Sequence, residues 1–250
     1  MAMREIRFAG SSAELAARFD VADDAIGTAL FAHCFTCSKD IAAARRIAEG
    51  LNQRGVSVLR FDFTGLGHSD GEFGNTSFSS NIADLLAAAA WLRENAQAPK
   101  LLIGHSLGGA AVLSAAFDVP ECTAVATVGA PSDPGHVTHL FGQQREEIEA
   151  CGIATVTLAG RKFDIAKSFL DDLETHQLTD RLSGLNKAVL FMHAPGDTIV
   201  GIDEAAKLYT AAKHPKSFVS LDDADHLLTR PRDAQYVADV LAAWAGRYLG

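Results

Sequence analysis

Two kinds of apolar segment alternate along most of the chain. Short apolar runs, such as 28–32 and 56–61, are typical of buried strands, whereas 41–54 has apolar residues three or four positions apart, as in an amphipathic helix. Apolar strands that alternate with helices predict an α/β fold, with a mostly parallel central sheet and helices on both faces. Strands are predicted at 5–8, 16–21, 28–32, 56–61, 100–103, 124–128, 188–192 and 217–221, and helices at 41–54, 78–95, 110–117, 204–212 and 234–249.

One segment, 131–184, interrupts this alternation. It is polar and mixed in composition, and it contains a candidate hairpin of two short strands, 154–158 and 163–165, joined by a turn at 159–162. Because it falls between two predicted strands of the sheet, we expect a small cap inserted into a single domain that spans residues 1–250.

Composition and charge narrow the class of protein. Hydrophobic residues make up 48% of the chain and charged residues 21%, which is typical of a globular domain. The net charge of −9 disfavours binding to nucleic acid or to an anionic membrane. The first ten residues lack the apolar core of a signal peptide, and four cysteines do not form a disulfide framework. We therefore expect a soluble, reduced, cytoplasmic enzyme or binding protein; its oligomeric state is not indicated.

The motif Gly104-His105-Ser106-Leu107-Gly108 matches the pattern G-x-S-x-G. It lies between a predicted strand and a predicted helix, which is the context of a nucleophile elbow. A sharp turn there exposes the serine hydroxyl and points the backbone N–H of the following residue toward a developing oxyanion. The motif predicts Ser106 as a nucleophile and Leu107 as an oxyanion donor.

A serine nucleophile needs a base that is oriented by a carboxylate. Asp197 and His226 each follow a predicted strand of the sheet, in the chain order serine, acid, histidine that such a fold requires. We predict these two residues as the acid and the base. Asp133, which follows the preceding strand, is an alternative acid.

The loop 33–36 follows the third predicted strand and is expected to provide the second oxyanion donor, the backbone N–H of Phe35. Its phenyl ring would form one wall of a pocket for the acyl group. The cap is short and charged, without a long apolar helix, and this favours short, soluble substrates over emulsified lipid. The side chains predicted to bind substrate come from the loop and the cap: Cys34, Phe35, His136 and Phe169.

Together these motifs resemble the α/β-hydrolase superfamily, from about residue 28 to residue 228. Residues 62–69 resemble the family's Asp-x-x-Gly-x-Gly-x-Ser turn, and residues 33–35 resemble its His-Gly-x oxyanion loop, with Cys34 in place of glycine. Residues 32–40 and 220–226 are similar to the hydrolase half of bacterial proteins that are fused to an OsmC-type peroxidase domain; the 250 residues contain no such second domain. The resemblance implies a serine esterase that acts on small acyl groups.

Other interpretations of the sequence are weaker or remain open. The glycine pair at 65 and 67 lacks the spacing of a nucleotide-binding loop, and no residue set predicts a cofactor or a metal site. Cys34 and Cys37 form a C-x-x-C pattern, which leaves a redox role open beside a structural one. A perhydrolase or a peptidase would use the same catalytic residues, and a non-catalytic binding module would use the same fold.

Overall fold

The computed structural model of the chain describes residues 2–158 and 160–250. Eight strands form one sheet in the order β1-β2-β4-β3-β5-β6-β9-β10. The strands from β3 onward are parallel, and β1 and β2 add an antiparallel edge. The predicted α/β fold is confirmed. The bounds of the strands are β1 Ala2–Ala9, β2 Glu14–Val21, β3 Gly27–Ala32, β4 Val56–Phe61, β5 Leu101–His105, β6 Ala124–Val128, β9 Ala188–His193 and β10 Lys216–Ser220.

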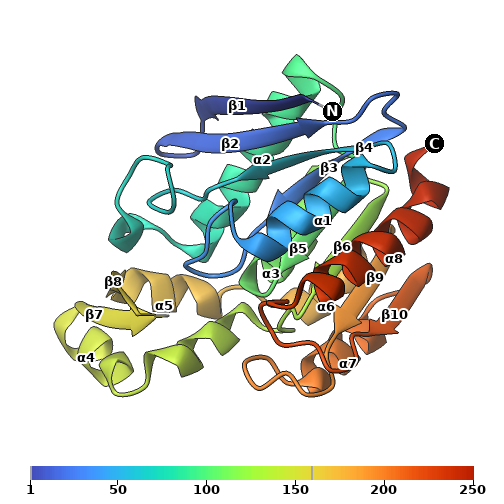
Figure 1. Cartoon of the computed structure of the whole chain (residues 1–250). Helices are drawn as coiled ribbons and strands as arrows, with labels where there is room; N and C mark the ends of the chain where they lie inside the picture. Colours follow the sequence, from blue (N-terminus) through green and yellow to red (C-terminus); the bar gives the residue numbers. More distant parts are fainter. Residues whose placement is uncertain (1, 159) are drawn as a thin grey trace.

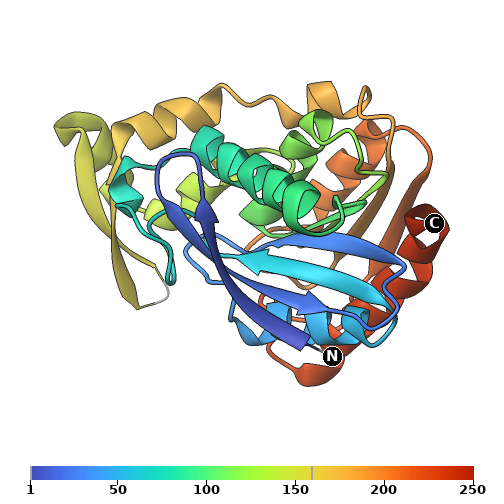
Figure 2. The ribbon, with the colours of Figure 1, turned by 90° about the horizontal axis from the view of Figure 1, so that it is seen from above.

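Helices cover both faces of this sheet (Figures 1 and 2). On one face, α1 (Ala42–Asn52) and α8 (Pro231–Leu249) pack against each other and against the buried strands. On the other face lie α2 (Phe78–Asn95), α3 (Leu107–Ala115) and α7 (Ile202–Ala211). The apolar stripe of α1 that predicts a helix, including Ile47 and Leu51, is the face that it buries. The sheet is therefore enclosed by two apolar layers, and its carboxyl edge is left for the loops.

The helix α3 begins three residues earlier than its sequence predicts. Gly108 and Gly109 lie in its first turn, where glycine disfavours a helix by about 1 kcal/mol per residue. Close packing of this turn against the sheet overrides that preference, because every residue of α3 is buried. Helix formation here is imposed by the tertiary structure.

Residues 131–184 form the insertion between β6 and β9. The predicted hairpin is confirmed as an antiparallel pair of strands, although Arg161 and Lys162 belong to the second strand and not to the turn. Ala159, which the prediction places in that turn, lies outside the described residues. The hairpin packs on the short segment η1 (Phe73–Asn75), so the insertion contacts the loop that follows β4 (Figure 1). The elements of the insertion are η3 Pro134–Phe141, α4 Gln144–Cys151, β7 Ile153–Leu158, β8 Arg161–Ala166, α5 Lys167–Glu174 and α6 Leu178–Leu182.

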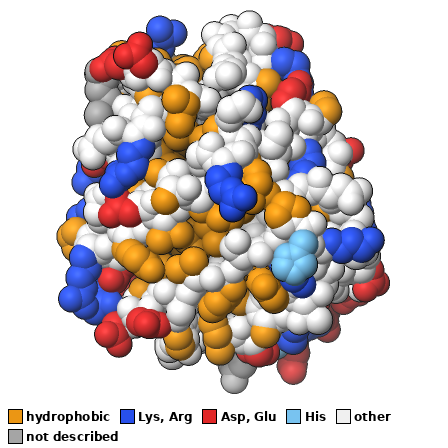
Figure 3. Space-filling view, turned by 90° about the vertical axis from the view of Figure 1, so that its right-hand side faces the viewer, with side chains coloured by type: hydrophobic (Ala, Val, Ile, Leu, Met, Phe, Trp, Pro, Cys, Tyr) orange, Lys and Arg blue, Asp and Glu red, His pale blue; other side chains and the backbone are white. Residues whose placement is uncertain are grey.

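The surface at the β10 edge mixes apolar side chains with charges of both signs (Figure 3). Phe218 on β10 and Tyr236 on α8 are among its exposed large side chains. Within the described residues, no helix has the length and apolar character needed to cross a membrane.

Candidate active site

Ser106 lies at a sharp turn between β5 and α3. Its backbone has φ +55° and ψ −126°, a conformation that is unfavourable for a residue with a side chain. The neighbouring glycines make the turn possible. A Cβ atom at Gly104 would lie 2.2 Å from the carbonyl oxygen of Gly108, and one at Gly108 would lie 2.4 Å from that of His33. The motif thus forms the predicted elbow.

Three side chains from distant parts of the chain meet at this elbow. The Nε2 atom of His226 lies 3.0 Å from the Oγ atom of Ser106, and its Nδ1 atom lies 2.7 Å from the Oδ2 atom of Asp197. Asp197 follows β9, and His226 follows β10, so the parallel strands deliver both side chains to one edge of the sheet. With Nδ1 protonated, the imidazole donates to Asp197 and accepts from the serine hydroxyl. This arrangement can activate a serine as a nucleophile.

The surroundings of Asp197 keep its carboxylate charged. Burial acts to raise its pKa, but the hydrogen bond from His226 and those from the backbone N–H groups of Val200 and Ile199 outweigh burial, and the pKa is lowered. The two N–H groups lie 3.0 and 2.9 Å from its Oδ1 atom. The alternative acid, Asp133, is exposed and accepts a hydrogen bond from the N–H of Gly135. The structure therefore pairs His226 with Asp197.

His105, the residue before the serine, holds the loop of His226. Its Nε2 atom lies 2.6 Å from the backbone carbonyl oxygen of His226. Burial, together with the nearby His226, lowers the pKa of His105 to about 4. His105 is thus neutral near pH 7 and donates this hydrogen bond from Nε2.

The loop after β3 approaches the elbow from the other side. The backbone N–H groups of Phe35 and Leu107 donate no hydrogen bond to any residue that the structure describes. Leu107 is the first residue of α3, where N–H groups lack a partner within the helix. Both groups are available to an oxygen atom at the serine.

A disulfide between Cys34 and Cys37 closes this loop. The expectation of a fully reduced chain is therefore wrong for this pair, whereas Cys122 and Cys151 are free thiols. The N–H of Cys37 also donates to the carbonyl of Cys34, at 3.0 Å. The disulfide and this hydrogen bond thus hold the turn that presents the N–H of Phe35.

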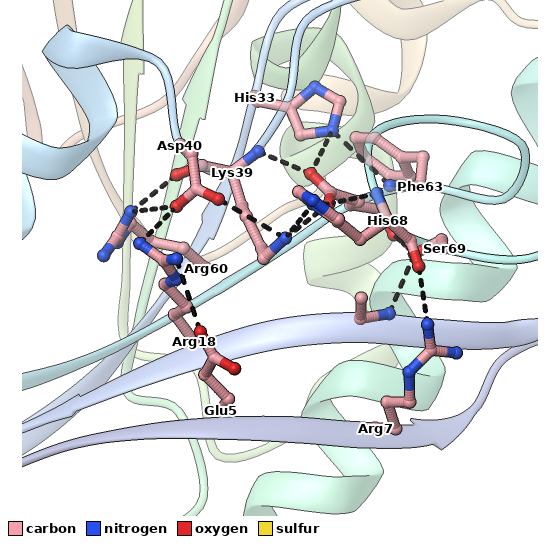
Figure 4. A network of polar contacts seen from close by, with 12 residues as sticks. Glu5, Arg7, Arg18, His33, Lys39, Asp40, Arg60, Phe63, His68 and Ser69 are labelled. Carbon is pink, nitrogen blue, oxygen red and sulfur yellow. Dashed lines mark hydrogen bonds and ion pairs between the residues drawn. The ribbon is translucent and has the colours of Figure 1, made fainter.

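A buried ion pair anchors the loop on its far side (Figure 4). The Nζ atom of Lys39 lies 2.6 Å from the Oδ2 atom of Asp62, and the backbone N–H of Lys39 lies 2.6 Å from Oδ1. Asp62, at the end of β4, also accepts from the N–H of His68. The guanidinium of Arg60 donates to the carbonyl of Lys39. This network ties the loop after β3 to the loop after β4.

A small cavity lies beside the elbow, and we call it the aromatic cavity. It has a volume of about 10 Å³ and is bounded by Phe35 and Leu107. Its other walls come from the loops after β3 and β4 and from η1, α2 and α3. The remaining lining residues are His33, Cys34, Phe63, Leu66, Phe73, Asn81, Gly108 and Ala111.

Rings from the cap cover this cavity on the side of Phe35. The ring of Phe35 lies 5.6 Å from that of Phe169 and 6.1 Å from that of Phe141, measured between centroids. Phe73 in turn lies 5.1 Å from Phe163 of the hairpin. The cap therefore contributes apolar contacts beside the cavity.

Comparison with known proteins agrees with this geometry. A family model described as "Serine aminopeptidase, S33" matches residues 31–148. The crystal structure of the esterase domain of a Rhodothermus marinus protein superposes with a TM-score of 0.82, at 48% sequence identity over 100% of both chains. The chain belongs to the α/β-hydrolase superfamily. It is thus a hydrolase of the α/β fold.

More distant members of the superfamily are also similar to this hydrolase. Mitochondrial palmitoyl-protein thioesterase ABHD10 of Mus musculus is 31% identical over 161 residues, which cover 62% of this chain and 53% of the mouse protein. The hydrolase thus spans about half the length of the curated relatives that it matches. The structure of Est1E from Butyrivibrio proteoclasticus with ferulic acid has a TM-score of 0.84, with 97% and 98% of the chains covered. At 20% identity, this likeness shows the fold alone.

The predicted substrate-binding residues of this hydrolase lie in two places. Cys34 and Phe35 line the aromatic cavity, and Phe169 packs on Phe35 from the cap. His136 lies in a separate groove, where its Nε2 atom is 3.0 Å from the carbonyl oxygen of Ile199. Its contact with substrate stays a prediction, as does the similarity to OsmC-type fusion proteins.

Sequence analysis missed two residues of the site, His105 and Asn81. His105 is visible in the motif, but its bond to the loop of His226 joins positions 121 residues apart. Asn81 lies on the buried face of α2. Its only signal in the sequence is a polar residue at a position of the helix where apolar residues are expected. Among the described residues, no group of three or more His, Cys, Asp or Glu side chains could hold a metal ion.

Proposed function

We propose that this hydrolase cleaves short, soluble carboxylic esters through an acyl-enzyme. The observation that supports it most is the chain of contacts from Ser106 Oγ to His226 Nε2, at 3.0 Å, and from His226 Nδ1 to Asp197, at 2.7 Å. In this proposal, residues 1–250 form one domain with the cap at 131–184.

The proposed reaction has two halves. Ser106 attacks the acyl carbon while His226 accepts its proton, and the N–H groups of Phe35 and Leu107 stabilise the oxyanion. His226 then protonates the leaving alcohol, and the acyl-enzyme forms. Water, activated by His226, attacks the acyl carbon and releases the acid. Asp197 holds the imidazole in the required tautomer and stabilises its charged form in both halves.

The aromatic cavity favours short acyl groups. Its volume is about 10 Å³, far below the roughly 300–1,000 Å³ of sites for drug-sized ligands, so it has no room for a long acyl chain as it stands. The side chains of Phe35 and Phe73 form apolar walls, and the cap covers the outer side of Phe35. A long acyl chain, such as the palmitoyl group in the name of the mouse relative, would require the cap to move.

A chain-length series tests this proposal. The hydrolase is assayed with nitrophenyl esters from acetyl to hexadecanoyl, and kcat/KM is measured below and above the solubility limit of each ester. We expect a maximum at short acyl chains and no rise in rate on emulsified substrate. A maximum at long chains, or a jump in rate above the solubility limit, would refute the proposed substrate class.

A further inference from the structure

The disulfide between Cys34 and Cys37 lies where a local change would act on the proposed reaction. It encloses Phe35 and Thr36, and the N–H of Phe35 is one of the two proposed oxyanion donors. Stabilisation by a cross-link increases with the length of the loop that it closes. A bond between residues three positions apart therefore adds little to the stability of the whole domain, and its effect is confined to this turn.

The backbone of this turn adopts a conformation that its sequence does not favour. The N–H of Cys37 donates to the carbonyl of Cys34 at 3.0 Å, and their Cα atoms are 5.3 Å apart, so the four residues form a β-turn. Thr36, the third residue of the turn, has φ +59°. Glycine or asparagine is favoured there, and a β-branched residue with positive φ is an outlier. Two restraints oppose relaxation of Thr36: the disulfide, and the guanidinium of Arg161 in the cap, which donates to its carbonyl.

The two ends of the loop are held independently of the disulfide. Before the turn, the Nδ1 atom of His33 lies 2.8 Å from the carbonyl oxygen of Cys34. After the turn, the backbone N–H and the ammonium group of Lys39 both donate to the carboxylate of Asp62, each at 2.6 Å. Breaking the disulfide would therefore leave the loop anchored at both ends and would loosen the segment that carries the N–H of Phe35.

The two cysteines of the disulfide differ in their access to solvent. Cys34 is 4% exposed and lines the aromatic cavity, whereas Cys37 is partly exposed. In thiol–disulfide exchange a thiolate attacks one sulfur of the bond directly, and the reaction depends on access to that sulfur. An external thiolate would therefore attack Cys37, and Cys34 would be the leaving group.

We propose that the disulfide between Cys34 and Cys37 is a redox switch, and that its reduction by a dithiol lowers the activity of the hydrolase. This inference rests on the proposed function and adds regulation of the same site. A thiolate of the dithiol attacks the Sγ atom of Cys37, the S–S bond breaks, and Cys34 leaves as a thiolate that takes up a proton. The second thiol of the dithiol loses its proton and attacks its own sulfur in the mixed disulfide, which releases Cys37 as a thiol.

Two electrons and two protons thus pass from the dithiol to the protein, and the dithiol becomes a cyclic disulfide. In the reduced protein, Thr36 relaxes from its positive φ, and the N–H of Phe35 moves away from the oxyanion. Exchange with a small disulfide runs the same steps in reverse and restores the turn.

Reduction of the intact protein tests this proposal. The wild type is treated with dithiothreitol or with oxidised dithiothreitol, and the reagent is removed without oxygen before the assay, because thiols themselves cleave nitrophenyl esters. The fraction of reduced protein is measured by mass spectrometry after alkylation. The kcat for nitrophenyl acetate and the rate of labelling by a fluorophosphonate probe are measured on the same samples. Reduction should lower both by at least about 10-fold and by up to the roughly 10²–10³-fold of a lost oxyanion donor, and oxidation should restore both.

Cysteine variants separate the switch from other effects of the reagent. Cys37→Ser cannot form the disulfide, so it should show the low kcat of the reduced wild type under both conditions. Cys34→Ser provides the same measurement if Cys37→Ser does not fold. Cys151→Ser removes an exposed free thiol of the cap and should keep the wild-type kcat and the full response. In the wild type, kcat should follow the fraction of molecules that hold the disulfide, while the circular dichroism spectrum stays unchanged.

The outcomes distinguish the switch from the proposed esterase function. A kcat that falls by less than about 10-fold in fully reduced protein would overturn the switch and leave the esterase function intact. The contact from Arg161 would then be enough to hold the turn. A loss of activity that oxidation does not restore would also overturn the switch. Labelling that falls on reduction, without turnover of any ester, would support the switch and overturn the ester substrate. Neither turnover nor labelling in the oxidised wild type would overturn both proposals.

Discussion

Replacing His105 with glutamine should change how stability depends on pH. In the folded protein, burial lowers the pKa of His105 to about 4 from the usual 6.5. As the pH falls through 6.5, the unfolded chain binds a proton at this histidine that the folded chain does not bind. The unfolded state is thereby stabilised, and the free energy of unfolding decreases between pH 6.5 and pH 4. Glutamine keeps an N–H donor for the carbonyl of His226 but does not titrate.

The size of this change in stability follows from the lowered pKa of His105. A difference of about 2.5 pKa units, at about 1.4 kcal/mol per unit, gives a loss of about 3 kcal/mol on going from pH 8 to pH 4. Urea unfolding across this pH range measures the free energy of unfolding of the wild type and of His105→Gln. Titrations common to both proteins cancel in the difference between the two values. The wild type should lose about 3 kcal/mol relative to the variant.

A matched control is His139→Gln, which changes an exposed histidine of the cap. Relative to the wild type, this variant should show no pH-dependent difference of that size. A constant difference between the free energies of unfolding of the wild type and His105→Gln from pH 8 to pH 4 would contradict this reasoning. In that case His105 would not be held neutral by burial, and the hydrogen bond that we assign to its neutral form would have to be revised.

Three further variants test the roles of the acid and of the oxyanion loop. Asp197→Asn should lower kcat by about 10³–10⁴-fold, because the imidazole loses the partner that fixes its tautomer, whereas Asp133→Asn should leave kcat unchanged. The reverse result in steady-state assays would move the acid to the segment after β6. The double variant Cys34→Ala/Cys37→Ala should loosen the turn that presents the N–H of Phe35. Its kcat should fall by up to roughly 10²–10³-fold, the effect of a lost oxyanion donor, and its KM should change less. An unchanged kcat would show that other contacts hold this turn.

The sequence predicts the fold well because strand and helix patterns repeat through most of the chain. Buried strands such as β6 appear as mostly apolar runs, and the ends of β9 and β10 locate Asp197 and His226 on one edge of the sheet. The elbow is equally visible, because its glycines are needed for close backbone contacts within a few residues. The start of α3 is not visible, because glycines at its first turn contradict local helix preference.

The features that sequence analysis missed depend on contacts between distant segments. A C-x-x-C pattern is compatible with thiols, a disulfide or half of a metal site, and the conformation of the loop decides among these for Cys34 and Cys37. Asn81 resembles any polar residue of an amphipathic helix until the loops after β3 and β4 bring aromatic rings around it. Burial of this kind is a property of the assembled fold.

The most direct test of the proposed mechanism is the reactivity of Ser106. The folded wild type should be labelled by a fluorophosphonate probe and should hydrolyse nitrophenyl acetate. Ser106→Ala, folded as judged by circular dichroism, should show no labelling and a kcat lower by roughly 10⁶-fold. Ser114→Ala, a change to a buried serine within α3, should keep both activities. Labelling or turnover that persists in folded Ser106→Ala would contradict a serine mechanism at this elbow.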